Sequence, residues 1–587
     1  MNEDQVNDII RRWQNSPEDE LKPEDYQQFK NLGSACLSEG DGAKLLTFLQ
    51  DEKNQGIVKS MGCVLMAPLV NKVVKQEKRL DQCQAAITHL TRTCSPDKLL
   101  HSLHELIEDI DPGAISETIL ALVPHLQTVL LQLDDRKAAC MGLALAALQK
   151  QLSRLPVPYT RQQEEADEYG LCRCYKALAV FTKPFIEEVK RKNGNHNTSE
   201  DEELRTELLK FCMRSLREPL LEAELNRDRQ SSLWHFATEI MVTLPAIQES
   251  LSEILFFSPL KKSSQMDSSE SKESRACLAY LLFVQLITID SFPAVFSPVF
   301  VLQCNMEYTN QLLSSKKESH LLKGLALYTK SLENVQDNGI PVSLQELKSF
   351  YCVPQNLRQV LTDCPMQHLR ESGLKVLQLF IDKLEVEAKY KFFRCMLKTS
   401  HHAGVESYII KNIRNQVESS MEPGNANKWF LGEELLSLLG LVLCFPQGPE
   451  TDLLNSMDRI MESLNLLRYL LIRDTILRSS TVWEELCRIK DDYLKLLRVC
   501  ISISRGYYAS ELKALREDQK MKAKEARDAA RSSRLVKSIT VKHEKMSDMS
   551  PEVQHQVLQS ALVTFDLMES LIVRIEEITE EKLKIQN

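Results

Sequence analysis

The stretch Asn427-Lys-Trp-Phe-Leu-Gly432 opens the part of the chain that decides the fold. It leads into a leucine-rich block, then into Pro446-Gln-Gly-Pro449, and then into a second periodic segment that ends at Arg473. The block leaves almost no polar face, which indicates a helix covered by protein on most sides. The prolines and the glycine after it stop that helix. The second segment repeats apolar residues at steps of three and four, which predicts one inward stripe: Leu453, Met457, Ile460, Leu464, Leu467 and Leu471. The stretch therefore predicts a helical hairpin.

The opposite face of the second helix carries two residues that a solvated surface does not need. Projected at about 100° per residue, this face holds Arg459, Glu462, Leu466, Tyr469 and Arg473. Because a helix in a stacked array touches neighbours on two sides, Leu466 and Tyr469 fit a second packing layer. They also fit a partner-binding face with an apolar centre and a charged rim. We keep both interpretations and treat the five residues as a candidate binding face.

The rest of the chain repeats this amphipathic pattern. Its 587 residues exceed what one core normally serves, and 18 Gly and 21 Pro leave little turn material for a large sheet. The breaks between the apolar-periodic segments are short, which predicts that consecutive helices pack antiparallel. No strict repeat consensus is visible. We therefore expect an all-α protein: an irregular HEAT- or armadillo-like α-solenoid of stacked antiparallel helix pairs.

Polar segments indicate where this array divides. Residues 261–275 are rich in Ser, Lys and Glu, and predict a flexible linker between an N-terminal half, 1–260, and a C-terminal half, 276–587. Residues 511–548 are charged and poor in apolar residues, which predicts a solvated helix that frays into a flexible insertion. A last helix is predicted from Ser550-Pro551, with a stripe that must dock on the array: Leu558, Ala561, Phe565, Met568, Ile572 and Ile575.

Charge and cysteine usage narrow the functional classes. A formal net charge of -9 supplies no strong positive field to gather phosphates, so nucleic-acid binding is not expected. The 16 cysteines are scattered through apolar segments without the spacing of a disulfide framework, which indicates reduced packing residues. The start of the chain lacks the basic and apolar regions of a signal peptide, and no long uninterrupted apolar run follows. We expect a cytoplasmic protein without membrane insertion.

No motif predicts catalysis. The sequence has no Gly-rich phosphate loop, no Gly-x-Ser-x-Gly elbow and no His-Glu-x-x-His. The run His101-Ser-Leu-His-Glu-Leu-Ile-Glu108 places two histidines and two glutamates on one helix face, but the interleaved leucines favour an ordinary polar face over a metal site. The two thiols of Cys172-Arg-Cys174 point to different faces of a helix, which favours core packing. We predict no enzyme, no metal and no cofactor.

Blocks distributed over nearly the whole length carry a resemblance to a known family. They are Leu155-Pro-Val-Pro-Tyr159, Tyr169-Gly-Leu-Cys172, Phe181-Thr-Lys-Pro-Phe-Ile-Glu-Glu188, Gly404-Val-Glu406, Asn427-Lys-Trp-Phe430, Glu450-Thr-Asp-Leu-Leu454, Asp458-Arg-Ile-Met461, Ser463-Leu-Asn-Leu-Leu-Arg-Tyr469 and Thr564-Phe-Asp566. In these blocks the chain resembles the glomulin family.

The resemblance implies a function that the residues alone do not. Members of this family are HEAT-like solenoids whose C-terminal region binds the RING domain of the RING-box subunit of cullin-RING ubiquitin ligases and masks the surface that recruits the ubiquitin-conjugating enzyme. The family is also associated with immunophilins and with a receptor tyrosine kinase. We expect a non-catalytic regulator of this kind, with Trp429 and Phe430 as an alternative anchor to the face on the second hairpin helix. A general helical-repeat adaptor is the alternative.

Overall fold

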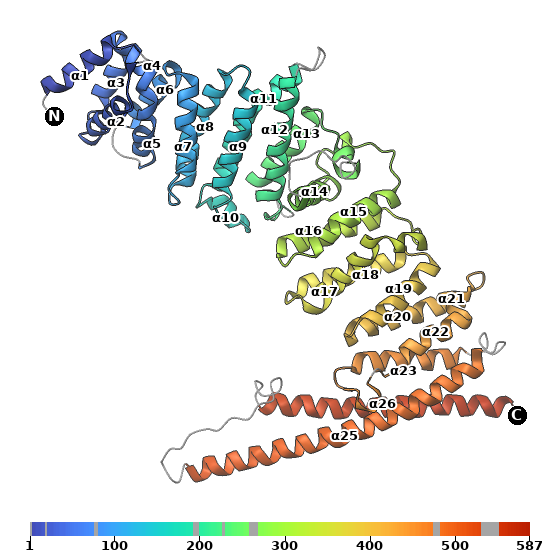
Figure 1. The fold of residues 1–587 in the computed structure, drawn as a ribbon. Coiled ribbons are helices and arrows are strands. Elements are labelled where there is room, and N and C mark those ends of the chain that lie inside the picture. The colour runs from blue at the N-terminus through green and yellow to red at the C-terminus, as the bar shows by residue number, and fades with distance from the viewer. Residues whose placement is uncertain are drawn as a thin grey trace. The chain divides into compact units, whose positions relative to one another are not determined.

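The computed structural model describes residues 3–17, 20–75, 80–191, 199–225, 229–257, 268–445, 447–473, 482–529 and 551–586. Apart from one isolated β-bridge between Ile340 and Leu384, the regular elements in these ranges are helices (Figure 1). The predicted all-α class is therefore confirmed.

The chain forms two compact units, and each is described by itself. The first comprises Met1–Val335 and Ser349–Asn356, and the second comprises Gln336–Lys348 and Leu357–Asn587. The division therefore falls within helix α17 (Lys348–Asp363).

These units do not coincide with the predicted halves 1–260 and 276–587. Helix α14 (Ser268–Phe283) packs on α12 (Ser199–Ser215) and on η4 (Leu216–Leu220), which belong to the same unit. Residues 276–282 are wholly buried, so α14 is core of the first unit. Residues 261–267 of the predicted linker lie outside the described residues, and residues 268–275 form the start of α14.

Helices of the first unit stack in two layers. Helices α7 (Pro96–Glu108) and α9 (Lys137–Leu152) precede α12 in one layer, and α8 (Ile115–Leu131), α11 (Leu171–Arg191) and α13 (Ser232–Ala246) follow one another in the other. Figure 1 shows α7, α8, α9, α11 and α12 side by side. The remaining elements are α1 (Glu3–Asn15), α2 (Pro23–Ser38), α3 (Gly42–Gln50), η2 (Glu52–Asn54), α4 (Gln55–Met61), η3 (Gly62–Leu65), α5 (Met66–Val74), α6 (Leu80–Thr93), α10 (Arg161–Ala166), η5 (Glu253–Phe257), η7 (Ile289–Ser291), α15 (Pro298–Leu313) and α16 (Glu318–Glu333).

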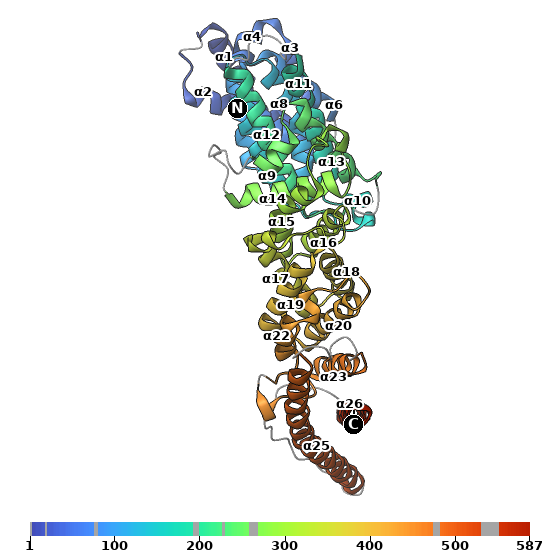
Figure 2. The same ribbon diagram turned by 90° about the vertical axis from the view of Figure 1, so that its right-hand side faces the viewer.

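The second unit shows the two layers plainly. Helices α19 (Val386–Thr399), α22 (Glu433–Val442) and α25 (Val482–Ala529) pack on one another in sequence, and so do α20 (Ala403–Ser420), α23 (Met457–Ile472) and α26 (Pro551–Gln586). Figure 2 shows α19 and α22 on one side and α20 and α23 on the other. The remaining elements are η8 (Val342–Glu346), α18 (Gln367–Lys383), α21 (Lys428–Leu431) and η9 (Gly448–Glu450). This layering is that of the predicted helical-repeat solenoid.

The predicted hairpin exists as α22 and α23, and its packing follows the array. Helix α22 packs on α19 and α23 packs on α20, so each arm lies against its counterpart in the preceding repeat. The inward stripe of α23 is confirmed, because Ile460, Leu464, Leu467 and Leu471 are at most 2% exposed.

The structure describes the charged segment 511–548 only in part. Residues 511–529 continue α25, which is 48 residues long, so the charged segment is helical at least to Ala529, and 530–548 lie outside the described residues. The predicted stripe of α26 is confirmed, since each of its six members is at most 2% exposed. The helix docks on α25 and α23, as its stripe requires.

Within the part of the chain that the structure describes, two stretches are long and apolar enough to cross a membrane by length and composition alone: Glu52–Val74 and Glu552–Glu581. The first is divided among η2, α4, η3 and α5 and is 56% buried inside the protein. The second is 28% buried, along the stripe by which α26 docks.

Candidate partner-binding site

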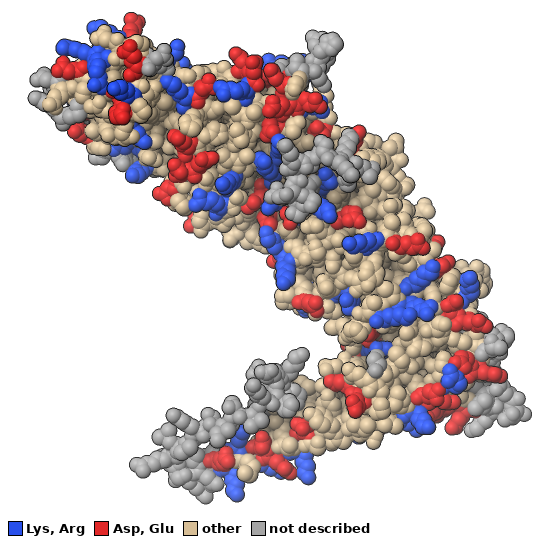
Figure 3. Space-filling view, viewed as in Figure 1, with Lys and Arg blue, Asp and Glu red and all other residues tan. Residues whose placement is uncertain are grey.

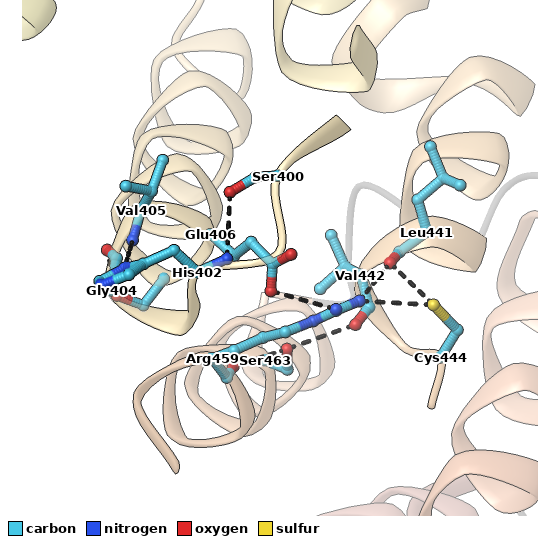
Figure 4. A network of polar contacts seen from close by, with 11 residues as sticks. Ser400, His402, Gly404, Val405, Glu406, Leu441, Val442, Cys444, Arg459 and Ser463 are labelled. Carbon is cyan, nitrogen blue, oxygen red and sulfur yellow. Dashed lines mark hydrogen bonds and ion pairs between the residues drawn. The ribbon is translucent and has the colours of Figure 1, made fainter. Parts of the chain in front are cut away.

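Arg459, the first residue of the predicted face on α23, is buried and connects neighbouring helices through polar contacts (Figure 4). Its Nη1 lies 3.1 Å from Oε2 of Glu406 on α20, and the two side chains are 11% and 7% exposed. Its Nη2 donates to the carbonyl of Leu441 near the end of α22 at 2.9 Å. Arg459 therefore joins three helices and is not available to a partner.

Leu466 distinguishes between the two interpretations of this face. It is 1% exposed and shares the face of Arg459, which packs on α20. Of the two interpretations of this face, the second packing layer is the one that the structure contains at Arg459 and Leu466. The physical reason is the stacking itself, because α23 lies between α20 and α26 and must bury residues on two sides.

The other residues of the predicted face are more accessible. Glu462 and Tyr469 are half-buried and Arg473 is exposed. Burial raises the pKa of Tyr469, and the nearby Glu418 adds to that rise. Ile472, beside Arg473, is 48% exposed. Only the end of the predicted face thus reaches solvent.

The alternative anchor, Trp429 with Phe430, is mostly core. The side-chain oxygen of Asn427 accepts from the backbone N–H groups of both residues at 3.2 and 3.1 Å, which caps α21 and turns Phe430 inward. Phe430 is fully buried. Trp429 is half-buried, with its ring centroid 5.1 Å from that of Tyr390 and the Nζ of Lys428 at 4.8 Å over it.

Sequence reasoning missed two exposed apolar stripes, one on α25 and one on α26. On α25, Val499, Ile503 and Tyr507 are 44%, 55% and 59% exposed, and on α26 Val563 and Leu567 are each 53% exposed. We call these five residues, which form one stripe on each of the two helices, the outer face. The spacing of four residues on each helix is a signal that a helical projection of 499–507 and 563–567 could have found.

The outer face points away from the core of the unit. Leu497 and Ile501 of α25 are fully buried, and at about 100° per residue Val499 and Ile503 lie on the opposite side of the helix from Ile501. In the same way Val563 and Leu567 lie opposite Phe565, which is 1% exposed. Both helices therefore carry apolar residues on their outward sides.

Ion pairs fix how the two helices run past each other. Arg498 lies 2.6 Å from Glu576, and Arg505 lies 2.6 Å from Asp566 and 2.8 Å from Glu569. These pairs set an antiparallel register in which Tyr507 is level with Leu567. Each exposed pair contributes about 0–1 kcal/mol, so their main effect here is to hold one register.

The outer face has the composition of a protein-binding surface. Its members are four aliphatic residues and one tyrosine, whereas the ion pairs of Arg505 join the two helices. Figure 3 shows acidic and basic side chains intermixed over the face in view, without a large field of one sign.

The rejected metal candidate lies on α7 in the first unit. Nε2 of His101 is 3.3 Å from Oε1 of Glu105, and both side chains are largely exposed. Burial lowers the pKa of His104. Cys172 and Cys174 are buried in the core, and burial raises the pKa of Cys174 to about 12. Within the described ranges no group of three potential ligands comes together.

Two layers of stacked helices define a helical-repeat protein. A family model described as "Uncharacterised protein family, YAP/Alf4/glomulin" matches residues 1–561, and the chain belongs to this family. It is 43% identical to glomulin of Homo sapiens over 596 residues, which covers 99% of this chain and 98% of that protein. It is also 43% identical to glomulin of Mus musculus over 595 residues, with the same coverage of each chain.

One solved structure is similar over most of the chain. It is a circular tandem repeat protein with novel repeat topology and enhanced subunit contact surfaces, at 14% identity, with 96% of this chain and 98% of that chain covered. The TM-score is 0.20, and the likeness carries no argument about this fold.

Proposed function

We propose that this chain binds the RING domain of the RING-box subunit of cullin-RING ubiquitin ligases through the outer face, and blocks recruitment of the ubiquitin-conjugating enzyme. Membership of the glomulin family supports the class of partner. The position of the outer face in the second unit agrees with the C-terminal contact that the resemblance implies. The proposal places the chain in the cytoplasm with its partner.

The observation that carries the proposal is the exposure of five apolar side chains on the last helix pair. Terminal repeats of a solenoid usually present a polar outer side, because that side has no further repeat to cover it. On α25 the exposed Tyr507 follows the exposed Val499 and Ile503, and aromatic residues are among the few that supply most of the binding free energy of an interface. The outer face thus has the chemistry of an interface.

Inhibition in this proposal is occlusion. The chain performs no chemical step, and it competes with the conjugating enzyme for one surface of the RING domain. The paired helices hold the outer face in a single register through Arg498 and Arg505, so little ordering of the surface is required on binding.

The test is a competition experiment with the full chain. An isolated RING-box RING domain is titrated with this protein in the presence and absence of its conjugating enzyme, and ubiquitin transfer is followed in parallel. We expect binding to the RING domain, displacement of the conjugating enzyme and slower transfer. Binding that leaves the conjugating enzyme in place would contradict occlusion, and absence of binding would contradict the partner.

A general cytoplasmic adaptor is the second candidate, and the same outer face supports it. Such an adaptor would contact an immunophilin or a receptor tyrosine kinase, the other partners that the resemblance implies. Failure to bind the RING domain, together with binding of one of these partners that depends on Ile503 and Tyr507, favours the adaptor.

A further inference from the structure

The first unit contains a cleft whose lining residues are distant in sequence from the outer face. Its volume is about 730 Å³, within the range of ligand-binding pockets. The extended stretch 155–159, the start of α14, the kinked element η4 and the first turn of α16 line it. These elements meet because the backbone of Glu218 is extended (φ -146°, ψ 119°) and interrupts the helix there.

Most charged groups in this cleft are already paired. Nε2 of His320 lies 3.1 Å from Oε1 of Glu222, and Lys317 donates to the same oxygen. These two partners, His320 first, lower the pKa of Glu222 to about 2. Arg217 lies 3.3 Å from Glu273. The negative charges of Glu222 and Glu273 are thus balanced by neighbouring basic side chains.

Glu218 is the exception. It is half-buried, and among the described residues its carboxylate makes no hydrogen bond and no ion pair. Burial raises its pKa, and the neighbouring Arg217 and Lys317 offset that rise only in part. Tyr175 donates to its backbone carbonyl at 3.3 Å, which helps to hold the residue in place. A cation that entered the cleft would meet a carboxylate without a direct partner.

Apolar groups surround this carboxylate. Leu155, Val157 and Leu221 line the same cleft, together with the half-buried ring of Tyr159. A ligand that satisfies both features has a cationic head on an aliphatic stem. Phosphate-bearing ligands fit poorly, because Glu218, Glu222, Glu273 and Glu318 all line the cleft.

We propose that this cleft binds an arginine side chain presented by an extended segment of a partner protein, with Glu218 as the acceptor. The planar guanidinium can give two parallel hydrogen bonds to one carboxylate, and its stem can cover the apolar wall. Its face can also stack on Tyr159. Lysine would supply a point charge without the paired geometry, so arginine is preferred.

The test uses the full chain and three blocked peptides. The first is acetyl-Ala-Leu-Arg-Leu-Ala-amide, the second has citrulline, which has the shape of arginine without its charge, and the third has lysine in the same position. Binding is measured by titration calorimetry at physiological salt. Glu218→Gln is the test variant. Glu105→Gln is the matched control, because Glu105 lines the other large cleft of this unit, of about 720 Å³.

We expect the arginine peptide to bind the wild type at least about tenfold more tightly than the citrulline peptide. Glu218→Gln should abolish this preference and leave the thermal midpoint unchanged or raised, while Glu105→Gln should keep it. Equal affinity for both peptides, no binding of either, or an equal loss in both variants would overturn the proposal. A lysine peptide that binds as tightly as the arginine peptide would overturn the choice of arginine.

Discussion

Arg459 of α23 and Glu406 of α20 form a buried ion pair at 3.1 Å, on the face for which the sequence allowed either a second packing layer or a partner contact. The same guanidinium also reaches the carbonyl of Leu441 near the C-terminal end of α22, where the helix dipole favours a positive charge. One side chain therefore connects both layers of the second unit.

Removal of either partner should loosen this part of the array. We expect Arg459→Ala to reduce the local free energy of unfolding of α20 and α23 by about 3–5 kcal/mol, because it leaves the carboxylate of Glu406 buried without its partner. Amide hydrogen exchange of these helices measures the change. Arg473→Ala on the same helix is the control and should change little, since Arg473 is exposed.

A double variant tests whether the ion pair itself is the cause. Arg459→Met with Glu406→Met leaves no unpaired charge, so its destabilisation should be smaller than the sum of the two single changes. Additive losses would mean that the residues act independently.

Leu466 should behave as a core residue. We expect Leu466→Ala to cost about 2–5 kcal/mol of stability through the cavity it leaves, whereas Ile472→Ala, at a position 48% exposed, should cost under about 1 kcal/mol. Chemical denaturation of the full chain, with hydrogen exchange to localise the loss in α23, checks both values. Equal effects at the two positions would contradict the burial of Leu466.

Acid should weaken the first unit through Glu222. Its pKa falls from an ordinary 4.5 to about 2 in the folded chain, so the stability that it contributes is present above pH 4.5 and is lost as the pH falls toward 2. At pH 6 the wild type should exceed Glu222→Gln by on the order of 2 kcal/mol. Thermal unfolding of both proteins between pH 6 and pH 3 should show the gap narrowing. A gap that does not vary with pH would show that Glu222 acts through something other than its charge.

A variant of Trp429 distinguishes between the two proposed contacts with the RING domain, α21 and the outer face. The ring of Trp429 packs on Tyr390. Trp429 belongs to α21, which is separated in sequence from α25 and α26. We expect Trp429→Ala to leave affinity for the RING domain within about twofold, as expected away from the few residues that supply most of an interface's energy. A loss comparable to that of outer-face variants, measured by the same titration, would return the anchor to α21.

The helical class and the inward stripes were accessible from sequence, because burial repeats with the period of the helix. Ile460, Leu464 and Leu467 illustrate this, since each lies on a stripe that is both regular and buried. The second side of α23 was not accessible in the same way. Whether Leu466 meets solvent or α20 depends on which helices stack on α23, and a projection of one helix contains no information about its neighbours.

The outer face illustrates the opposite limit. Val499, Ile503 and Tyr507 follow a helical period, and such a stripe usually indicates core. Only the docking of α26 against the other side of α25 shows that these three residues remain uncovered. A sequence can therefore indicate which residues share a face, but packing decides which face is left open.

The most direct test of the proposed function compares two pairs of exposed apolar residues. Ile503→Ser with Tyr507→Ser changes the outer face, and Val180→Ser with Val242→Ser changes side chains of the first unit that are 55% and 51% exposed. With folding of both confirmed, we predict that the outer-face variant loses at least about tenfold in affinity for the isolated RING domain, and that the control keeps wild-type affinity. Wild-type affinity in the outer-face variant would contradict the assignment of this face as the RING contact.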